Sequence, residues 1–266
     1  MSISSTLVHR AEIEFHEAAD VLRPFVGCFW VINAQRDATI RVVPDGSTAI
    51  SIQLQKSYTP EWILRGPLVR PDERRFTSDA QLVGIRLRPG VAFLLSKTPV
   101  HTMVGRRIAL NGVAAFHDLV AESPRPLTPE QCIDVLQRFL VQRLADARLH
   151  CVVADALHEI EHAHGCILAA DVAARCRVSA RHLHRLMRTW VGYGPKCYAN
   201  IIRFQTTLHG MEHVPGPTAA ALTADNGYFD QAHLILDVAR FAGATPGRLA
   251  SAGVADFSKT RCDDLP

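Results

Sequence analysis

Residues 179–190 constrain the fold more than any other part of the chain. At helical spacing they divide into an apolar face and a polar face. The apolar face consists of Leu183, Leu186, Met187 and Trp190. The polar face consists of Arg181, His184, Arg185 and Arg188. Ser179 is suited to cap the helix, because its hydroxyl accepts backbone N–H bonds. The segment therefore predicts an amphipathic helix with one buried face and one cationic, hydrogen-bonding face.

The preceding residues, LAADVAARCRV, predict a short helix and a tight turn. Two helices joined in this way are typical of a helix-turn-helix unit. In such a unit the second helix packs its apolar side on the first and projects hydrogen-bond donors into the DNA major groove. An ordinary amphipathic surface helix has the same apolar stripe, so this segment alone leaves both interpretations open.

A second segment with the same layout begins about 50 residues later. We predict a short helix over 218–224, a turn over 225–228 and an amphipathic helix over 229–241. Its apolar stripe is expected to contain Leu234, Ile235, Val238 and Phe241. Two such units in one chain favour DNA binding over a chance surface helix.

A single long helix is predicted between the two units, over 195–211. Pro195 is tolerated in a first helical turn. One face is traced by Tyr198, Ile201, Ile202, Gln205 and Leu208. At 1.5 Å per residue this helix spans roughly 25 Å. That length, with the widths of the flanking helices, is enough to hold two recognition helices about one DNA turn apart, near 34 Å.

Residues 148–250 resemble the DNA-binding domain of the AraC/XylS family of bacterial transcription regulators. The matching stretches are AADVAARCRVSARHLHRLMR, GYGPKCYANIIRFQ and NGYFDQAHLILDVARFAGATPGRL. In the first recognition helix the resemblance implies base contacts by Arg181, His184 and Arg185, with Arg188 nearer the DNA backbone. In the second it implies contacts by Gln231, Ala232, His233 and Leu236.

The chain departs from this family at two places. Arg177 stands where the turn usually has glycine, so a left-handed backbone there costs roughly 1 kcal/mol. Leu236 and Ala239 stand where relatives often have arginine. Residues 165–191 carry five arginines and one aspartate, whereas residues 192–266 carry six Lys or Arg and seven Asp or Glu. We therefore expect the first unit to supply most of the DNA affinity.

The predicted fold class is α+β. A β-rich N-terminal domain, a small barrel or sandwich with appended helices, precedes an all-α DNA-binding domain with two helix-turn-helix units. We expect a regulatory domain over 1–147, an AraC-type DNA-binding domain over 148–250 and a tail over 251–266. Residues 1–164 carry eighteen Lys or Arg and eighteen Asp or Glu, which does not favour DNA binding by that half.

Short runs rich in Ile, Val, Thr and Leu predict strands at 39–43, 48–54, 61–64 and 81–87. PDGS, KSYTP and the charged RPDERR are interpreted as the segments that separate these strands. Helices are predicted in PGVAFLLSK, NGVAAFHDLVAE and TPEQCIDVLQRFLVQRLADA. The last begins with Thr128 as cap, Pro129 in the first turn and Gln131 placed to complete a capping box. The pieces GCFWVI, RVVPDGS, RGPLVRP and GIRLRPG resemble an uncharacterised β-rich domain found ahead of AraC-type DNA-binding domains.

The resemblance to that uncharacterised domain implies nothing about function, whereas the resemblance to AraC/XylS regulators implies that the N-terminal half senses a small molecule, dimerises, or both. An anionic or aromatic effector would suit a pocket of arginines and aromatic residues. The principal candidates are Trp30, Trp62, Arg65, Arg86 and Arg88, and the wider set adds Phe29, Tyr58 and Arg70. Arg86 and Arg88 alternate with apolar residues and are predicted to share one strand face. The alternative is that the aromatic residues form the core and the arginines are solvated.

A competing interpretation comes from residues 158–162, HEIEH, which match the HExxH pattern of zinc peptidases. The predicted apolar stripe of this helix, Val153, Leu157 and Ile160, turns both histidines toward solvent. A catalytic zinc needs a shielded cleft and a third ligand. We expect no metal site, and a metal-sensing site remains the alternative. Its candidate ligands are His158, His162, His164 and Cys166.

We expect no enzyme activity and no cofactor, since the chain has no GxSxG elbow, no GxxxxGK[ST] loop and no GxGxxG after a strand. The first residues lack the apolar core of a signal peptide, and no run of eighteen apolar residues occurs. These features predict a cytoplasmic protein without a membrane partner. The expected partners are double-stranded DNA and a small-molecule effector. The resemblance also implies a homodimer and, for an activator, contact with RNA polymerase.

Overall fold

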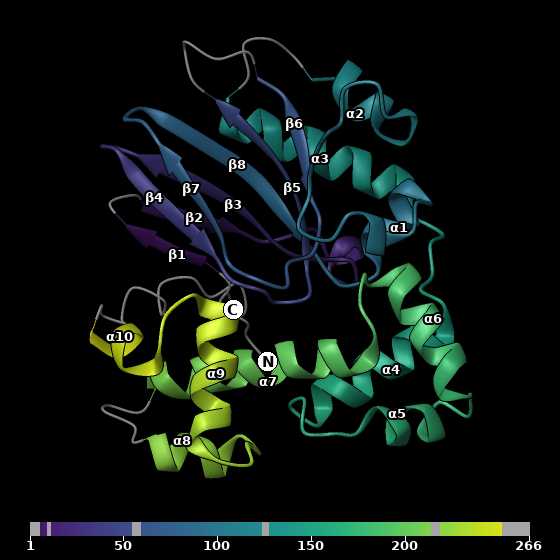
Figure 1. Ribbon diagram of the computed structural model, residues 1–266. Coiled ribbons are helices and arrows are strands. Elements are labelled where there is room, and N and C mark those ends of the chain that lie inside the picture. Colours follow the sequence, from purple (N-terminus) through teal and green to yellow (C-terminus); the bar gives the residue numbers. More distant parts are fainter. Residues whose placement is uncertain (1–5, 10–11, 55–59, 124–127, 214–218, 252–266) are drawn as a thin grey trace.

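The computed structural model describes residues 6–9, 12–54, 60–123, 128–213 and 219–251. Two antiparallel sheets lie in the N-terminal half, and helices form the C-terminal half (Figure 1). The larger sheet has the order β2 (Glu12–His16), β3 (Val26–Ala34), β8 (Ala80–Leu87), β5 (Thr48–Leu54), β6 (Trp62–Arg65) and β9 (Arg107–Ala109). The smaller has the order β1 (Thr6–His9), β4 (Ala38–Val42) and β7 (Asp72–Phe76). The predicted fold class is confirmed, but the sheets do not close into a barrel.

The four predicted strands correspond to β4, β5, β6 and β8. The interpretation of RPDERR as a separator is wrong, because this segment contains most of β7. That strand pairs with β4, and Arg41 donates a hydrogen bond to Glu73 directly opposite, with 2.9 Å between Nη2 and Oε2. An ion pair across the strands stabilises a charged strand at the edge of a sheet. Charge alone therefore did not mark the segment as a loop.

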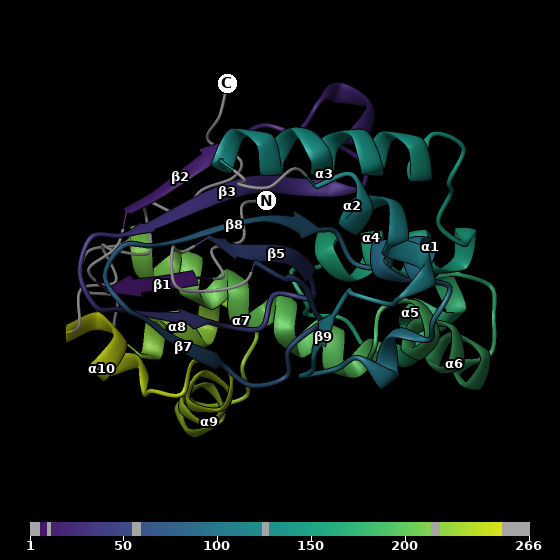
Figure 2. The ribbon, with the colours of Figure 1, turned by 90° about the horizontal axis from the view of Figure 1, so that it is seen from above.

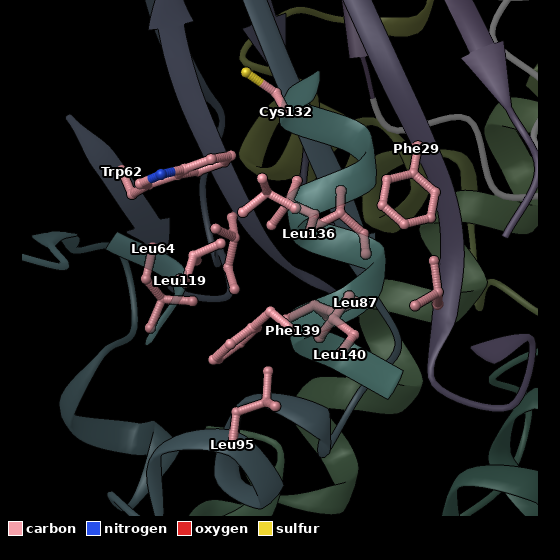
Figure 3. Packing of buried hydrophobic residues seen from close by; sticks show 14 of the residues in the cluster. Phe29, Trp62, Leu64, Leu87, Leu95, Leu119, Cys132, Leu136, Phe139 and Leu140 are labelled. Atoms are coloured by element: carbon pink, nitrogen blue, oxygen red, sulfur yellow. The ribbon is translucent and has the colours of Figure 1, made fainter. Parts of the chain in front are cut away.

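Short helices connect the strands, and one long helix covers the larger sheet. They are η1 (Asp20–Leu22), α1 (Val91–Ser96), η2 (Val100–Thr102), η3 (Ala114–Phe116), α2 (His117–Ala121) and α3 (Pro129–Leu144). The predicted capping box is confirmed, since Thr128 Oγ1 accepts from the Gln131 amide and the Gln131 side chain accepts from the Thr128 amide. Figure 2 shows α3 lying across the sheet. Leu136, Phe139 and Leu140 of α3 pack there against Phe29 and Leu87 (Figure 3).

The opposite face of the larger sheet is turned toward the smaller sheet. Ile32 and Leu82 pack there with Ile40 and Phe76 of the smaller sheet. Because β8 is covered on both faces, nearly all its residues are buried rather than every second one. The space between the two sheets is consequently an internal feature of the N-terminal half.

The C-terminal half consists of seven helices within the described residues. They are α4 (Cys151–His162), α5 (Ala169–Arg175), α6 (Ala180–Trp190), α7 (Pro195–His213), α8 (Ala219–Asp225), α9 (Gln231–Ala242) and α10 (Pro246–Ser251). All helices predicted there are confirmed, with small shifts at their ends. Thr218, the predicted first residue of α8, lies outside the described residues, as does the tail beyond residue 251. Ile235 was predicted on the buried stripe of α9, which is wrong, because the residue is 39% exposed.

The turn between α5 and α6 adopts the left-handed conformation anticipated for residue 177. Arg177 has a φ of 56° and is exposed. Replacing it with glycine is expected to stabilise the fold by about 0.5–1 kcal/mol, because relief of strain exceeds the entropy that glycine adds to the unfolded chain. Chemical denaturation of the two proteins measures this difference. An Arg177→Gly protein less stable than the parent would contradict the inference that the backbone of Arg177 is strained.

The two halves share an extensive interface. Trp190 at the end of α6 packs on Phe93 of α1, with 4.4 Å between ring centroids. Leu149, just before α4, packs against the buried cores of both halves. Tyr193 donates a hydrogen bond to the Leu68 carbonyl across the interface at 3.3 Å. These contacts place the first recognition helix directly against the N-terminal half.

Candidate DNA interface and ligand pocket

The first helix-turn-helix unit consists of α5 and α6. Ser179 caps α6 as predicted, its hydroxyl accepting from the His182 amide at 3.2 Å. Leu183 and Met187 are fully buried, which fixes the rotation of the helix about its axis. The opposite face is exposed and carries Arg181, His184, Arg185 and Arg188. This unit therefore presents a row of cationic and hydrogen-bonding side chains to solvent.

The second unit consists of α8 and α9. Asn226 in the turn is buried and donates to the Leu222 carbonyl at 2.9 Å, while Gly227 supplies a φ of 64°. Asp230 caps α9 by accepting from the His233 amide at 2.7 Å. The exposed face includes Gln231, Ala232 and Leu236, the last 70% exposed. The exposed surface here is largely apolar, in contrast to that of α6.

His233, predicted as a DNA contact, takes part in a polar network between α7 and α9. Arg203 of α7 forms an ion pair with Asp237, with 3.0 Å between Nη2 and Oδ2. The same guanidinium lies 3.4 Å from His233 Nε2 and over the ring of Tyr228. The network holds α9 of the second unit against the long helix α7. The His233 ring lies at the edge of this network.

The long helix α7 joins the two units (Figure 1). Its 19 residues span about 28 Å. A hollow beside its first turn is bordered by His184 of α6, Lys196 of α7 and Arg240 of α9. Lys196 and Arg240 are exposed and were not predicted as site residues. Lys196 lies outside both recognition helices and Arg240 lies near the end of α9, so only the packing of the three helices brings them together with His184.

A pocket lies between the two sheets of the N-terminal half. Three of the five principal effector candidates, Trp30, Arg65 and Arg86, line it. The pocket also contains Arg74, Arg107 and Asp72, which the sequence analysis missed because β7 and β9 were not predicted. Its apolar walls come from both sheets and include Ile13, Phe15, Ile32, Ile40, Phe76 and Leu82.

The remaining effector candidates lie elsewhere. Trp62 and Phe29 are buried on the side of the sheet that faces α3, where the Trp62 indole donates to Ser123 Oγ at 2.8 Å. Arg88 follows the end of β8, donates to the Arg23 carbonyl and does not line the pocket. Arg70 is exposed outside the pocket, and Tyr58 lies outside the described residues.

Ion pairs constrain two of the pocket arginines. Arg86 Nε lies 3.0 Å from Asp45 Oδ2, and Arg107 Nη2 lies 2.7 Å from Asp72 Oδ2. Burial raises the pKa of the Asp45 carboxyl, but Arg86, Arg65 and hydrogen bonds from Ser47 outweigh it, and the pKa lies below its usual value. Burial lowers the pKa of the Arg65 guanidinium, an effect that Asp45 and Asp72 partly oppose.

The HExxH segment occupies the exposed side of α4. His158 and His162 are exposed, with 5.9 Å between their ring centroids. Glu159, at the position of the catalytic glutamate, pairs with Arg175 at 2.6 Å. Among the residues described by the structure, no group of three His, Cys, Asp or Glu side chains is arranged to hold a metal ion. Cys166 instead contacts the turn of the second unit, 3.4 Å from the Asn226 carbonyl oxygen.

The described helices include none with the length and apolar character needed to span a membrane.

Comparison with known proteins identifies two sequence families in the chain. Residues 172–252 match a family described as a helix-turn-helix domain, and residues 14–109 match DUF6597, a domain of unknown function. No curated protein matches the sequence. The first match includes both recognition helices, and the second includes every residue that lines the pocket except Ile13.

Similar solved structures include ToxT from Vibrio cholerae, with 10% identity, a TM-score of 0.42 and coverage of 93% of this chain and 98% of that chain. Another is ToxT from V. cholerae strain SCE256 bound to an unsaturated fatty acid, with 11% identity, a TM-score of 0.41 and coverage of 94% and 96%. The AraC-like transcriptional activator CuxR has 13% identity, a TM-score of 0.22 and coverage of 79% and 89%. These TM-scores are too low for any property to be transferred to this chain.

Proposed function

We propose, from the AraC-type helix-turn-helix domain that this chain carries at residues 172–252, that it is a sequence-specific, effector-responsive transcription regulator. The observation that carries the proposal is the exposed cationic face of α6 within that domain. Arginine donors on a recognition helix read guanine edges and bind phosphates in the major groove. We place such a regulator in the cytoplasm, where bacterial DNA lies.

The two units are proposed to bind unequally. Arg181, His184 and Arg185 supply base contacts, with Arg188 on the DNA backbone. Gln231, Ala232 and Leu236 of α9 contribute shape and apolar contacts with thymine methyl groups. Lys196 and Arg240 are positioned to meet phosphates between the two grooves, because they border the hollow that separates the units. His233 contributes mainly through its contact with Arg203, in the network that holds α9 against α7.

The N-terminal residues 1–147 are proposed as the regulatory domain and 148–250 as the DNA-binding domain. α3 packs in the N-terminal core and α4 in the C-terminal core, which supports a boundary between them. The pocket between the two sheets is proposed as the effector site. A homodimer remains part of the proposal. Contact with RNA polymerase is proposed for the case in which the protein is an activator.

Selection of duplexes from random sequence by the purified full chain tests this function. We expect an enriched motif with two base-specific blocks about 10 base pairs apart. Affinity for the selected duplex should fall steeply with salt, because arginine contacts release counterions from the phosphates. The proposal fails if no motif is enriched, or if affinity for a scrambled duplex of equal length and composition is the same.

A further inference from the structure

The pocket in the N-terminal half contains a row of arginines. In the strand register, Arg86 of β8 lies opposite Ala49 of β5, which lies opposite Arg65 of β6, which lies opposite Arg107 of β9. Residues directly opposite on antiparallel strands project to the same face. Ala49, which lies between Arg86 and Arg65 and also lines the pocket, has only a small side chain. Arg86 and Arg65 therefore lie on either side of one position on the pocket floor.

The next row of the same face contains Trp30, Gly84, Ser51 and Ile63 and is apolar apart from the Ser51 hydroxyl. Trp30 lies opposite Gly84, and a Cβ at Gly84 would be 2.4 Å from the Trp30 ring, so the indole covers the glycine. Beyond it, Ile32 and Leu82 meet Ile40 and Phe76 of the smaller sheet. The pocket is thus mainly cationic at one end and mainly apolar at the other, where Arg74 of β7 donates to Gln53 Oε1 at 2.6 Å and lies over the Phe76 ring. This division suits a molecule with an acid group and an apolar body.

Arg65 lacks a fixed anionic partner. Its side chain forms no hydrogen bond or ion pair with any residue that the structure describes, although Asp45 and Asp72 lie near enough to act on its charge. The carboxylates near the pocket arginines are Asp45, paired with Arg86, and Asp72, paired with Arg107. The Arg65 side chain is half-buried, and a guanidinium that loses contact with water is unfavourable without an opposing charge. An incoming carboxylate would supply that charge and accept hydrogen bonds from the planar donor groups of arginine.

The loop between β4 and β5, residues 43–47, connects this pocket to the DNA-binding half. Val43 is fully buried in the core of the helical half. The Pro44 carbonyl accepts from Gln205 Nε2 of α7 at 2.6 Å. Gly46 lies against Tyr198 of α7, and a Cβ there would be 2.5 Å from Cε2 of its ring. Asp45, between these contacts, is only 4% exposed and extends back to Arg86.

We propose that the pocket binds an organic acid with an apolar body, that its carboxylate pairs with Arg65 and Arg86, and that binding is transmitted through Asp45 to α7. The inference rests on the proposed effector-responsive regulator and names its ligand class and relay. An acid bound to Arg86 competes with Asp45 for the same guanidinium. Loss of that pairing leaves a buried carboxylate poorly compensated. The loop then shifts, and with it the helix that joins the two recognition units.

Calorimetry on the full chain tests the ligand class. The probes are octanoate and 1-naphthoate, each compared with its neutral amide. We expect at least one acid to bind about tenfold or more tightly than its amide, and Arg65→Met to weaken that binding by about 10- to 100-fold. Arg36→Met is the matched control, because Arg36 is exposed in the turn between β3 and β4. The ligand class is wrong if neither acid is preferred, or if the two variants behave alike.

DNA binding with and without the preferred acid tests the relay. In the parent we expect the acid to change the Kd for the selected duplex at least about fivefold, and the duplex to change the Kd for the acid by the same factor. Asp45→Asn should retain acid binding and lose the change. Gln205→Met, which removes the bond to Pro44, provides a second variant should Asp45→Asn not fold. An unchanged coupling factor in the folded variants overturns the relay.

The two proposals fail separately. Absence of specific DNA binding by the parent chain contradicts the regulator itself. Specific DNA binding without preference for either acid leaves the regulator intact and overturns the ligand class. Acid binding without any effect on DNA affinity overturns only the relay through residues 43–47.

Discussion

Replacing Arg185 with alanine is expected to weaken binding to the selected duplex by about 5- to 150-fold, equivalent to 1–3 kcal/mol. Arg185 lies on the exposed face of α6, where a guanidinium is suited to bidentate contact with a guanine edge. Leu236→Ala on the exposed face of α9 should weaken binding by less than about fivefold, because a thymine-methyl contact carries less discrimination. Fluorescence anisotropy with labelled duplexes measures both values.

The pair of variants is informative because each side chain is exposed and leaves its helix packing intact. Thermal unfolding should show the parent stability in both. The asymmetry also predicts that Arg185→Ala relaxes sequence preference at one base pair, whereas Arg188→Ala weakens all duplexes alike and lowers the salt slope by about 1. Equal losses for Arg185→Ala and Leu236→Ala would contradict the dominance of the first unit.

Asp237→Ala is expected to lower the free energy of unfolding by about 3–5 kcal/mol. The ion pair between Arg203 and Asp237 is largely buried, with 13% and 11% of the two side chains exposed. Removing the carboxylate leaves a buried guanidinium whose Nε already lacks a hydrogen-bond partner among the described residues. Urea denaturation followed by circular dichroism measures the change.

The matched control is Arg175→Ala, which breaks an exposed ion pair with Glu159. Its unfolding midpoint should lie close to that of the parent, because solvent screens exposed pairs. Asp237→Ala should also weaken DNA binding, since α9 loses its brace to α7. Similar midpoints for the two variants would show that the network between α7 and α9 contributes little.

The helical half could be predicted from sequence because its signals are local. Apolar spacing, Ser179 as a cap and the glycine in the second turn each act within a few residues. The exposed Ile235 shows the limit of this approach. Three true stripe positions, Leu234, Val238 and Phe241, set the buried face, and Ile235 follows Leu234 by one residue, about 100° around the helix.

The pocket was only partly predictable, because it depends on pairing between distant strands. Strand alternation does separate Trp62 from Arg65, which are three residues apart in β6 and therefore face opposite sides of the sheet. That alternation alone excludes a shared pocket for these two candidates. No local signal places Asp72 or Arg107 at the pocket, since β7 is highly charged and β9 is only three residues long. The contact of residues 43–47 with α7 joins positions about 160 apart and follows only from the tertiary structure.

Chemical footprinting of the selected duplex by the full chain tests the central claim most directly. The two units, joined by α7, are predicted to protect guanines in two successive major grooves on one face of the duplex, about 10 base pairs apart. At saturating protein, Arg185→Ala should remove protection of the guanine that Arg185 contacts, while protection in the other groove persists. Protection confined to one groove in the parent, or on opposite faces of the duplex, would contradict the account.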